Sequence, residues 1–532
     1  MTAISKHGCA FVLLLLICWA TISAADRLPE SPPGSYFPLQ TRDHENTDSF
    51  KQGQPIVGTT YFYWYDIDTK SHIVDGDGTD ALTTHPADMN NISYKRVSWH
   101  RTQLRDMIEA GIDFLMPVFW GVPGKYDGWS FAGLPPLVKA HDALKDEGLK
   151  PPQIALFYDT SILKWNGFNK DGTNYHVDLT TDFGREWFYT PVRDFFSLIP
   201  PSKWARVDRK PIVFLYAVAF AKKQDEKQLD YLRDRFKKDF GCELFLVKQP
   251  QWLGQADATY SWGAAVNGPV INRQVAALGP GYDHSAVPGR SPLVVERHDG
   301  QTYVDRWLKL LQLDPVHRPW MVHVETWNEW HEGTDIAHSR EYGRSYIVLT
   351  RLFADMWRAK TCLRIQGSYL NADSVSWQPD KAQGLQLCPS SGDGIWKTCK
   401  LADVEAVVCA ANPHSAQSRY LYFNVDDAFA YDLFDRTVLV EVAYRDAGCS
   451  GFRVEYDNTD PQAGLHEGAF RPADGISIDG TSRWKTAKFT LPQCRFMNRC
   501  NGADFRISVS GGDLELALSE VKLVKTGQPV DH

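Results

Sequence analysis

This chain of 532 residues lacks any long run of lysine or arginine, and its formal net charge is -8. Proteins that bind nucleic acid through its phosphates usually carry a basic patch or stripe. The sequence shows no such charge pattern. We therefore expect no nucleic acid partner.

The sequence also lacks a glycine-rich phosphate loop. The segment "VGTTYFYWYD" (57–66) has one glycine where a dinucleotide fingerprint would have three. No Gly-x-Ser-x-Gly turn follows a strand, and no cysteine or histidine pairs have the spacing of a zinc site. We expect no metal and no cofactor, and acyl transfer is disfavoured.

A long apolar run occurs once, in "FVLLLLICWA" (11–20), between a lysine and the small residues Ser23, Ala24 and Ala25. This pattern predicts a cleaved secretory signal peptide at residues 1–25. An uncleaved anchor is the alternative, although the run is shorter than the ~20 residues of a membrane span. We expect a secreted, extracellular protein without a membrane partner. The sequon at Asn91 agrees with a glycoprotein.

Cysteine is scarce in the first half of the mature chain, where Cys242 stands alone. Disulfides commonly stabilise secreted domains, so the later cysteines predict a disulfide-stapled C-terminal domain. We expect Cys494 to bridge Cys500, and the other pairings stay open. The later cysteines are Cys362, Cys388, Cys399, Cys409, Cys449, Cys494 and Cys500.

After an N-terminal lead (26–53), apolar β-rich runs alternate with amphipathic stretches through residues 54–360. This alternation predicts an α/β fold, a (β/α)8 TIM barrel forming the catalytic domain. An open doubly wound sheet is the alternative. The eight predicted strands are 55–65, 112–120, 152–160, 211–218, 243–249, 257–263, 274–281 and 320–327.

Residues 361–383 form a predicted linker, and residues 384–526 show short alternating strands without helical segments. Leu421, Phe423 and Val425 alternate with polar neighbours, which predicts an all-β sandwich of the jelly-roll kind. Near the end the apolar phase slips between Leu518 and Val521, which predicts a β-bulge. We expect the two-domain chain to be a monomer.

The segment "TWNEWHEGT" (326–334) follows the last predicted barrel strand. Barrel enzymes hold their chemistry at this end of the strands, so Glu329 and Glu332 are the candidate catalytic pair. Two neighbouring carboxyl groups are the usual equipment for cleaving a glycosidic bond. The surrounding residues offer flat rings, hydrogen bonds or a third carboxyl group: Glu325, Trp327, Asn328, Trp330 and His331.

Other predicted strand ends carry aromatic and acidic residues, which favours a cleft lined for sugar. Core packing is the alternative for each aromatic residue, while an aspartate at an apolar strand end needs a partner or a ligand. Arg290 and Arg297 could pair with the site carboxylates. The further substrate-binding candidates are Trp64, Tyr65, Asp66, Trp120, Tyr158, Asp159, Tyr216, Trp262, Tyr282 and Asp283.

The segments "TWNEWHEGTDIAHSREYGRSYI" (326–347), "AGIDFLMPVFWG" (110–121) and "LGPGYDH" (278–284) resemble the family 99 glycoside hydrolases and their relatives, including domains of unknown function. The resemblance implies a (β/α)8 barrel and retaining, endo-acting cleavage of α-mannosides. It also implies that Glu332 is the general acid/base. Glu329 would deprotonate the 2-hydroxyl of the substrate, which then attacks the anomeric carbon.

The C-terminal segment "WKTAKFTLPQCRFMNRCNGADFRI" (484–507) resembles the jelly-roll modules appended to many polysaccharide enzymes. The resemblance implies a carbohydrate-binding module, or a domain that caps the barrel. Trp484, Tyr422 and Tyr431 are its aromatic candidates, with core packing as the alternative. Asp426 and Asp427 are candidate ligands for a calcium ion.

Together these patterns predict a secreted glycoside hydrolase that acts on a polysaccharide or glycan. Two alternatives stay open. A carbohydrate-binding protein without turnover would keep the same cleft, whereas a polysaccharide lyase would need a basic cleft around a uronate. The sugar, its linkage and endo or exo action are left open by the sequence.

Overall fold

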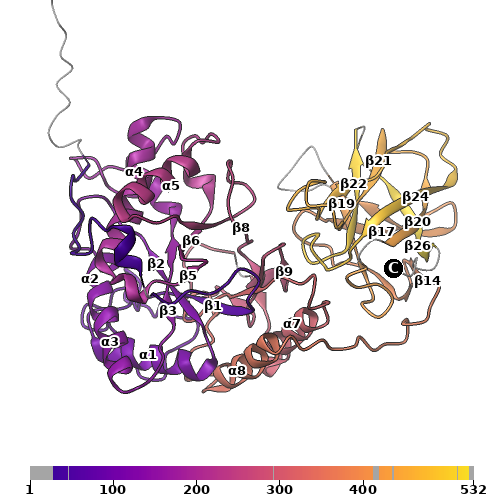
Figure 1. Cartoon of the computed structure of the whole chain (residues 1–532). Helices are drawn as coiled ribbons and strands as arrows, with labels where there is room; N and C mark the ends of the chain where they lie inside the picture. Colours follow the sequence, from indigo (N-terminus) through magenta and orange to yellow (C-terminus); the bar gives the residue numbers. More distant parts are fainter. Residues whose placement is uncertain are drawn as a thin grey trace, which may run out of the picture.

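The structure is a computed structural model that describes residues 28–45, 47–291, 293–410, 419–433, 436–511, 513 and 515–526. Figure 1 shows two lobes, the second formed by the C-terminal strands. The predicted signal peptide lies outside the described residues. Across the described ranges, no helix has the length and apolar character needed to cross a membrane.

The first lobe contains a mostly parallel sheet, and each of the eight predicted strand ranges holds a strand of it. The strand order is β8-β7-β6-β4-β2-β1-β13-β10-β9, with β9 antiparallel at one end. The parallel strands are β1 (Ile56–Tyr61), β2 (Phe114–Phe119), β3 (Gln153–Ile154), β4 (Leu156–Tyr158), β6 (Lys210–Leu215), β7 (Phe245–Lys248), β8 (Ala258–Thr259), β10 (Val275–Leu278) and β13 (Met321–Val324).

This sheet is curled, because side chains from distant strands meet inside it. The His323 ring of β13 lies 5.7 Å from that of Phe214 in β6 and 5.8 Å from that of Tyr260, which follows β8. His323 is fully buried, and this burial lowers its pKa to about 3, so it is a neutral core residue. Among the described strands no ladder joins β8 to β10, so full closure of the barrel stays a prediction.

Amphipathic helices cover the outer face of the curled sheet (Figure 1). Leu104 and Met107 of α1, for example, are fully buried, and the helix ends at Gly111 with a left-handed φ of 74°. The helices are α1 (Val97–Ala110), α2 (Trp129–Ala132), α3 (Leu134–Asp146), α4 (Asp182–Leu198), α5 (Gln228–Phe240), α6 (Ala264–Asn267), α7 (Gln301–Leu311) and α8 (Ser345–Arg358).

Shorter elements lie at the edges of this lobe. They comprise small strands that pair locally and single turns of 3-10 helix. They are β5 (Arg206–Val207), β9 (Val270–Ile271), β11 (Tyr282–Asp283), β12 (Val294–Val295), η1 (Thr41–His44), η2 (Thr160–Leu163), η3 (Pro201–Lys203), η4 (Val218–Phe220) and η5 (His298–Gly300).

The second lobe consists of two antiparallel sheets with their own apolar core. One sheet holds β14 (Ser374–Gln378), β15 (Lys381–Gln383), β17 (Trp396–Leu401), β18 (Val404–Cys409), β20 (Arg436–Arg445), β24 (Trp484–Cys494) and β26 (Ala517–Lys525). The other holds β16 (Leu385–Leu387), β19 (Arg419–Val425), β21 (Gly451–Tyr456), β22 (Arg471–Pro472), β23 (Ile476–Ser477) and β25 (Phe505–Ser510). The strands β14 and β15 thus fall inside the range predicted as a linker.

The predicted β-bulge near the C-terminus is confirmed. The register between β20 and β26 shifts where Ala443 faces Glu520 and Tyr444 faces Leu518. The extra residue in β26 moves the apolar phase from Leu518 to Val521, so both side chains stay in the core.

The prediction of disulfides is wrong for this structure, because all eight cysteines of the described ranges carry free thiols. Cys494 and Cys500, the predicted pair, belong to different apolar clusters. The thiol of Cys494 donates to the carbonyl of Leu491 at 3.1 Å, while that of Cys500 donates to the carbonyl of Ala469. The cysteine count alone carried no information about which thiols approach one another.

Candidate functional site

A cavity of about 630 Å³ opens at the carboxyl ends of the parallel strands. Three polar residues of its lining follow a strand directly: Asp159 follows β4, Tyr216 follows β6, and Glu325 follows β13. Strands of one direction end on the same side of a sheet, so these side chains converge. Nine predicted site residues line the cavity: Trp64, Asp159, Tyr216, Trp262, Tyr282, Glu325, Glu329, His331 and Glu332.

Glu329 is almost completely enclosed, with 3% of its surface exposed. Its Oε1 accepts hydrogen bonds from Nδ1 of His331 at 2.8 Å and from the backbone N of the same residue at 3.2 Å. Its Oε2 is buried without a hydrogen-bond partner among the described residues. Burial raises the pKa of Glu329, and the neighbouring His331 opposes this rise.

His331 is the main charge partner of Glu329. Burial lowers the pKa of His331, but the attraction of Glu329 outweighs it and leaves that pKa above its usual value. The Tyr65 ring stacks against His331, with centroids 5.4 Å apart. Tyr65 does not line the cavity, so its stacking supports the His331 ring on a side that does not face the cavity.

Glu332 has a more open setting than Glu329, with 24% of its side chain exposed. Its Oε1 lies 2.5 Å from Nη1 of Arg290 and forms an ion pair with it. The same arginine nitrogen lies 3.4 Å from the hydroxyl of Tyr282. Arg297 was the other arginine predicted as a partner for the site carboxylates. Its side chain is buried and instead pairs with Asp335 at 2.9 Å.

Glu325 is a third carboxyl group of the cavity. Its Oε2 accepts hydrogen bonds from the backbone N of Gly263 at 3.0 Å and of Ala265 at 3.3 Å. Its Oε1 is buried without a partner among the described residues. Burial raises the pKa of Glu325 to about 8, so at neutral pH this side chain is a neutral acid that can donate a proton in a hydrogen bond.

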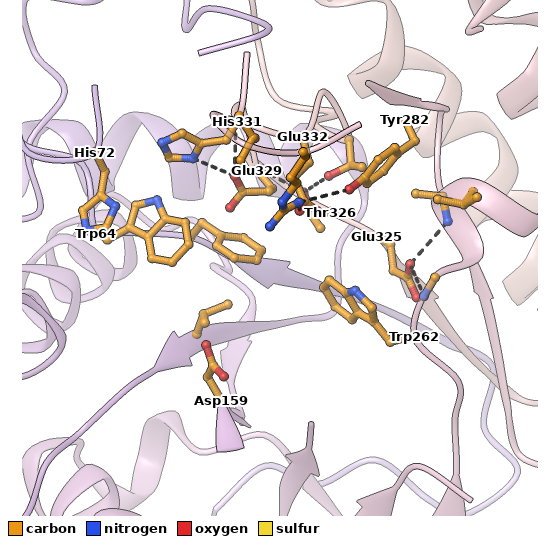
Figure 2. A pocket seen from close by; sticks show the side chains of 18 of the residues that line it. Trp64, His72, Asp159, Trp262, Tyr282, Glu325, Thr326, Glu329, His331 and Glu332 are labelled. Carbon is orange, nitrogen blue, oxygen red and sulfur yellow. Dashed lines mark hydrogen bonds and ion pairs between the residues drawn. The ribbon is translucent and has the colours of Figure 1, made fainter. Parts of the chain in front are cut away.

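Aromatic rings form two walls of the cavity. On one side Trp64 and His72 stack with centroids 4.6 Å apart and an angle of 6°. On the other, Trp262 packs edge to face against Tyr216 at 5.6 Å. Figure 2 shows Glu329 and Glu332 above Trp262, with Glu325 beside that ring. Flat apolar faces beside convergent polar groups suit a sugar ring.

Three predicted site residues of the motif lie behind the cavity wall and fix the motif in place. Asn328 exchanges two hydrogen bonds with the backbone of Phe62, at 2.8 and 2.7 Å. Trp327 donates from Nε1 to Gln103 of α1 at 2.8 Å. Trp330 is fully buried against Tyr65, with ring centroids 4.9 Å apart.

Two other predicted aromatic residues lie outside the cavity lining. Tyr158 is fully buried and stacks against Phe188 at 5.3 Å. Trp120 donates from Nε1 to the hydroxyl of Ser161 at 3.1 Å. Their position is that of packing residues under the rim.

The predicted aspartates Asp66 and Asp283 also lie outside the cavity lining. Asp66 is buried, and its carboxylate accepts from Ser93 and Lys95 at 2.7 Å each, and from Thr69 at 2.8 Å. Asp283 accepts from the backbone N of Ser285 at 2.8 Å. Each carboxylate has protein partners and needs no ligand for hydrogen bonding.

The sequence did not reveal two features of the cavity. His72 comes from the long loop between β1 and α1, which has no periodic pattern, and its left-handed φ of 55° is rare for a residue with a side chain. Burial lowers the pKa of His72 to about 4. Phe157 lies within β4 and lines the cavity. From the sequence, an apolar residue inside a strand is predicted to be a core residue. Its position became visible only with the curl of the sheet.

The described residues contain no group of three or more His, Cys, Asp or Glu side chains placed to hold a metal ion.

Solved structures with some similarity include glycoside hydrolases for the first lobe. A GH99 endo-alpha-mannosidase from Bacteroides thetaiotaomicron, in complex with BIS-TRIS-Propane, is 15% identical over 59% of this chain and 99% of that chain, with a TM-score of 0.42. A glycoside hydrolase-like protein is 15% identical over 58% of this chain and 96% of its own, with a TM-score of 0.39.

For the second lobe, the C-terminal CBM6 of a marine laminarinase from Zobellia galactanivorans is 9% identical over 29% of this chain and 99% of that chain, with a TM-score of 0.17. No curated protein matches the chain. A protein-family model described as a domain of unknown function (DUF5010) matches residues 41–368, more than half of the sequence. The chain therefore belongs to the DUF5010 family.

Proposed function

We propose that this protein is a glycoside hydrolase that cleaves O-glycosidic bonds in a polysaccharide or glycan, with Glu329 and Glu332 as its catalytic pair. One observation carries the proposal: two carboxyl groups of one motif enter the same ring-lined cavity in different electrostatic settings. The Glu329 side chain is buried beside His331, whereas the Glu332 side chain is partly exposed beside Arg290. Acid and base roles are commonly separated by such differences.

In this mechanism Glu329 is the base. Its raised pKa makes it a better proton acceptor near neutral pH, and its unpartnered Oε2 keeps an unused acceptor site for a substrate hydroxyl. Following the resemblance of the motif to family 99, Glu329 takes the proton of the sugar 2-hydroxyl. That oxygen then bonds to the anomeric carbon as the bond to the leaving oxygen breaks.

Glu332 is the proposed acid/base. It gives its proton to the leaving oxygen in the first step. In the second step it takes a proton from water as the water oxygen bonds to the anomeric carbon, the bond from that carbon to the 2-oxygen breaks, and Glu329 returns its proton to the 2-oxygen. Arg290 occupies Oε1 of Glu332, so this contact must loosen before Glu332 can reach the leaving oxygen. The loop of residues 284–291 that carries Arg290 lines the cavity through Val287 and Pro288.

The lyase alternative finds less support in this cavity. A lyase needs cationic groups around a uronate, but the lining offers one arginine, Arg290, and this residue already contacts Glu332. The same lining contains five acidic residues: Asp75, Asp159, Glu325, Glu329 and Glu332. A neutral sugar substrate fits this charge balance better than a uronate.

The remaining parts of the proposal rest on the sequence. The protein would be secreted after removal of residues 1–25 and would act as a monomer. The first lobe (54–360) would be a closed (β/α)8 catalytic barrel, with a carbohydrate-binding-like sandwich at 384–526. Intact mass and sedimentation of the secreted protein test the first two statements directly.

The decisive experiment measures reducing ends released from α-mannans, α- and β-glucans and uronate polymers, with ultraviolet detection of unsaturated products. Wild type is compared with Glu329→Gln and Glu332→Gln, and with Glu243→Gln as a matched control, since Glu243 pairs with Lys237 on the surface. We expect hydrolysis of one polymer and a loss of a hundredfold or more in each site variant only. Unsaturated products would establish a lyase, and binding without turnover would establish a lectin-like protein.

A further inference from the structure

A second large cavity lies between the two lobes, at the opposite end of the barrel strands. Its volume is about 580 Å³. The first lobe contributes residues that precede strands, such as Gln274 before β10 and Trp320 before β13. The second lobe contributes Thr459 and Pro461 from a loop. Parallel strands begin at one end and finish at the other, so this cavity is separate from the proposed catalytic cleft.

Hydrogen bonds between the lobes hold the walls of this cavity together. The backbone N of Arg273 donates to Oε2 of Glu467 at 2.8 Å, and Nη1 of Arg499 lies 3.4 Å from the carbonyl of Ile271. Met497 of the second lobe packs into the core of the first. These contacts fix the two walls of the cavity relative to each other.

The charge of the lining is mostly positive, although the chain carries a formal charge of -8. Two arginines of the lining form ion pairs with aspartates outside it: Arg499 lies 2.6 Å from Asp457, and Arg495 lies 3.0 Å from Asp432. The lining holds four arginines and one carboxylate: Arg273, Arg318, Arg495, Arg499 and Glu467.

The other two arginines have no carboxylate partner within ion-pair distance among the described residues. Arg318 is 7% exposed, and its guanidinium donates only to the carbonyls of Thr361 and Trp357, at 2.8 and 3.0 Å. This burial lowers the pKa of Arg318. Arg273 is exposed, and its guanidinium forms no ion pair with a carboxylate of the described residues. A buried cation without a counter-charge is costly, so an anion in the cavity would stabilise it.

We propose that this interlobe cavity binds an oxyanion, presented either as a free ion or as the sulfate or carboxylate group of an acidic sugar. Guanidinium groups recognise such oxyanions through paired N–H donors. The volume exceeds that of a single ion and falls within the range of small-ligand pockets, which leaves room for the sugar that carries the charge. The site does not depend on the proposed hydrolase activity.

The test is isothermal titration of the full chain with four probes: sodium sulfate, sodium phosphate, a uronate trisaccharide and a neutral trisaccharide. The variants are Arg273→Glu and Arg495→Gln, with Lys139→Glu on the exposed face of α3 as the charge-matched control. Glu329→Gln separates this site from the catalytic cleft. Thermal unfolding of each variant verifies its fold.

We expect one-to-one binding of at least one anionic probe, weakened about tenfold or more by Arg273→Glu and by Arg495→Gln. Lys139→Glu and Glu329→Gln should leave it unchanged, and added salt should weaken it. Tighter binding of the uronate than of the inorganic ions identifies an acidic glycan, and the reverse identifies a free ion. Absence of binding by all anionic probes, equal binding of the neutral trisaccharide, or binding that both arginine variants preserve would overturn the proposal.

Discussion

The two lobes treat their buried carboxylates differently. In the second lobe each oxygen of Asp457 has a partner: Oδ1 lies 2.8 Å from Nε of Arg499, and Oδ2 accepts from the backbone N of Met497 at 2.8 Å. Asp504 likewise accepts from two backbone N–H groups. Among the described residues, the buried carboxylate oxygens without a partner all lie in the first lobe, on Asp106, Asp194, Glu325, Glu329 and Asp335.

A buried carboxylate whose oxygens all have protein partners stabilises the fold, whereas one with an unpartnered oxygen can still bind a ligand. An unsatisfied buried polar atom costs free energy, so native proteins keep few of them. Glu325 and Glu329 are the two that also line the first cavity. The comparison therefore predicts that substitutions in the first lobe cavity affect turnover, whereas substitutions in the sandwich affect stability.

The largest expected effect is on turnover by Glu329→Gln. Removing the proton acceptor should lower kcat/KM by about 10²- to 10⁴-fold on the polymer found to be hydrolysed. The amide keeps the size of the side chain, so circular dichroism should report a folded protein. A variant with full activity would remove Glu329 from the mechanism and leave its unsatisfied oxygen unexplained.

The next effect is on stability, from Asp457→Asn in the sandwich. This change leaves the buried guanidinium of Arg499 without its counter-charge, and breaking such a pair costs about 3–5 kcal/mol. Denaturant unfolding measures it, with Asp474→Asn on the surface as the control. The kcat of the folded variant at low temperature should equal that of wild type. A large fall in kcat would contradict the division between the lobes.

A pH effect is expected from Glu325, whose folded pKa is about 8. An unfolded glutamate ionises near its ordinary pKa of about 4.3, so between these values the folded state retains a proton that the unfolded state has lost. Stability should therefore fall as pH rises through this window, at up to about 1.4 kcal/mol per pH unit. The contribution is fully present below the unfolded pKa.

Urea unfolding at pH 5, 6.5 and 8 tests this statement in wild type and in Glu325→Gln. The amide cannot ionise, so the variant should lose the part of the slope that Glu325 supplies. Equal slopes in the two proteins would show that Glu325 titrates normally, and the neutral acid would then play no part in binding.

The smallest effect is on substrate affinity, from Trp262→Ala. Loss of one ring face should raise KM about five- to tenfold, with a smaller change in kcat, because an aromatic contact contributes about 1 kcal/mol. Trp165→Ala serves as the control, since Trp165 is 49% exposed and does not line the cavity. An unchanged KM in Trp262→Ala would indicate that sugar binds elsewhere along the cleft.

Much of the fold was accessible from the sequence because it depends on local periodicity. All eight predicted parallel strands are present, and α1 and α5 confirm the predicted amphipathic stretches, since each buries one apolar face: Leu104 and Met107 in α1, Leu229 and Leu232 in α5. The bulge of β26 followed from one phase slip between Leu518 and Val521. The start of the sandwich was less accessible, because β14 has only five residues and β15 has three, all exposed.

The candidate site was accessible only in part. An acidic residue at a strand end predicts either a ligand contact or a partner, and the sequence does not say which. Asp159 lines the cavity, whereas Asp66 finds Ser93 and Lys95, which lie 27 and 29 residues further along the chain. His72 carried no signal at all, since its loop has no period to analyse.

The sequence by itself determined which segments become strands and helices and where two acids follow a strand end, because these depend on near neighbours in the chain. Tertiary structure alone decided that Arg290 reaches Glu332 while Arg297 reaches Asp335, and that the cysteines of the described ranges stay unpaired. It also decided that arginines of both lobes enclose one cavity. The physical reason is that hydrogen bonds and ion pairs depend on a few ångströms in space, and residues tens to hundreds of positions apart share no local pattern that encodes such a distance.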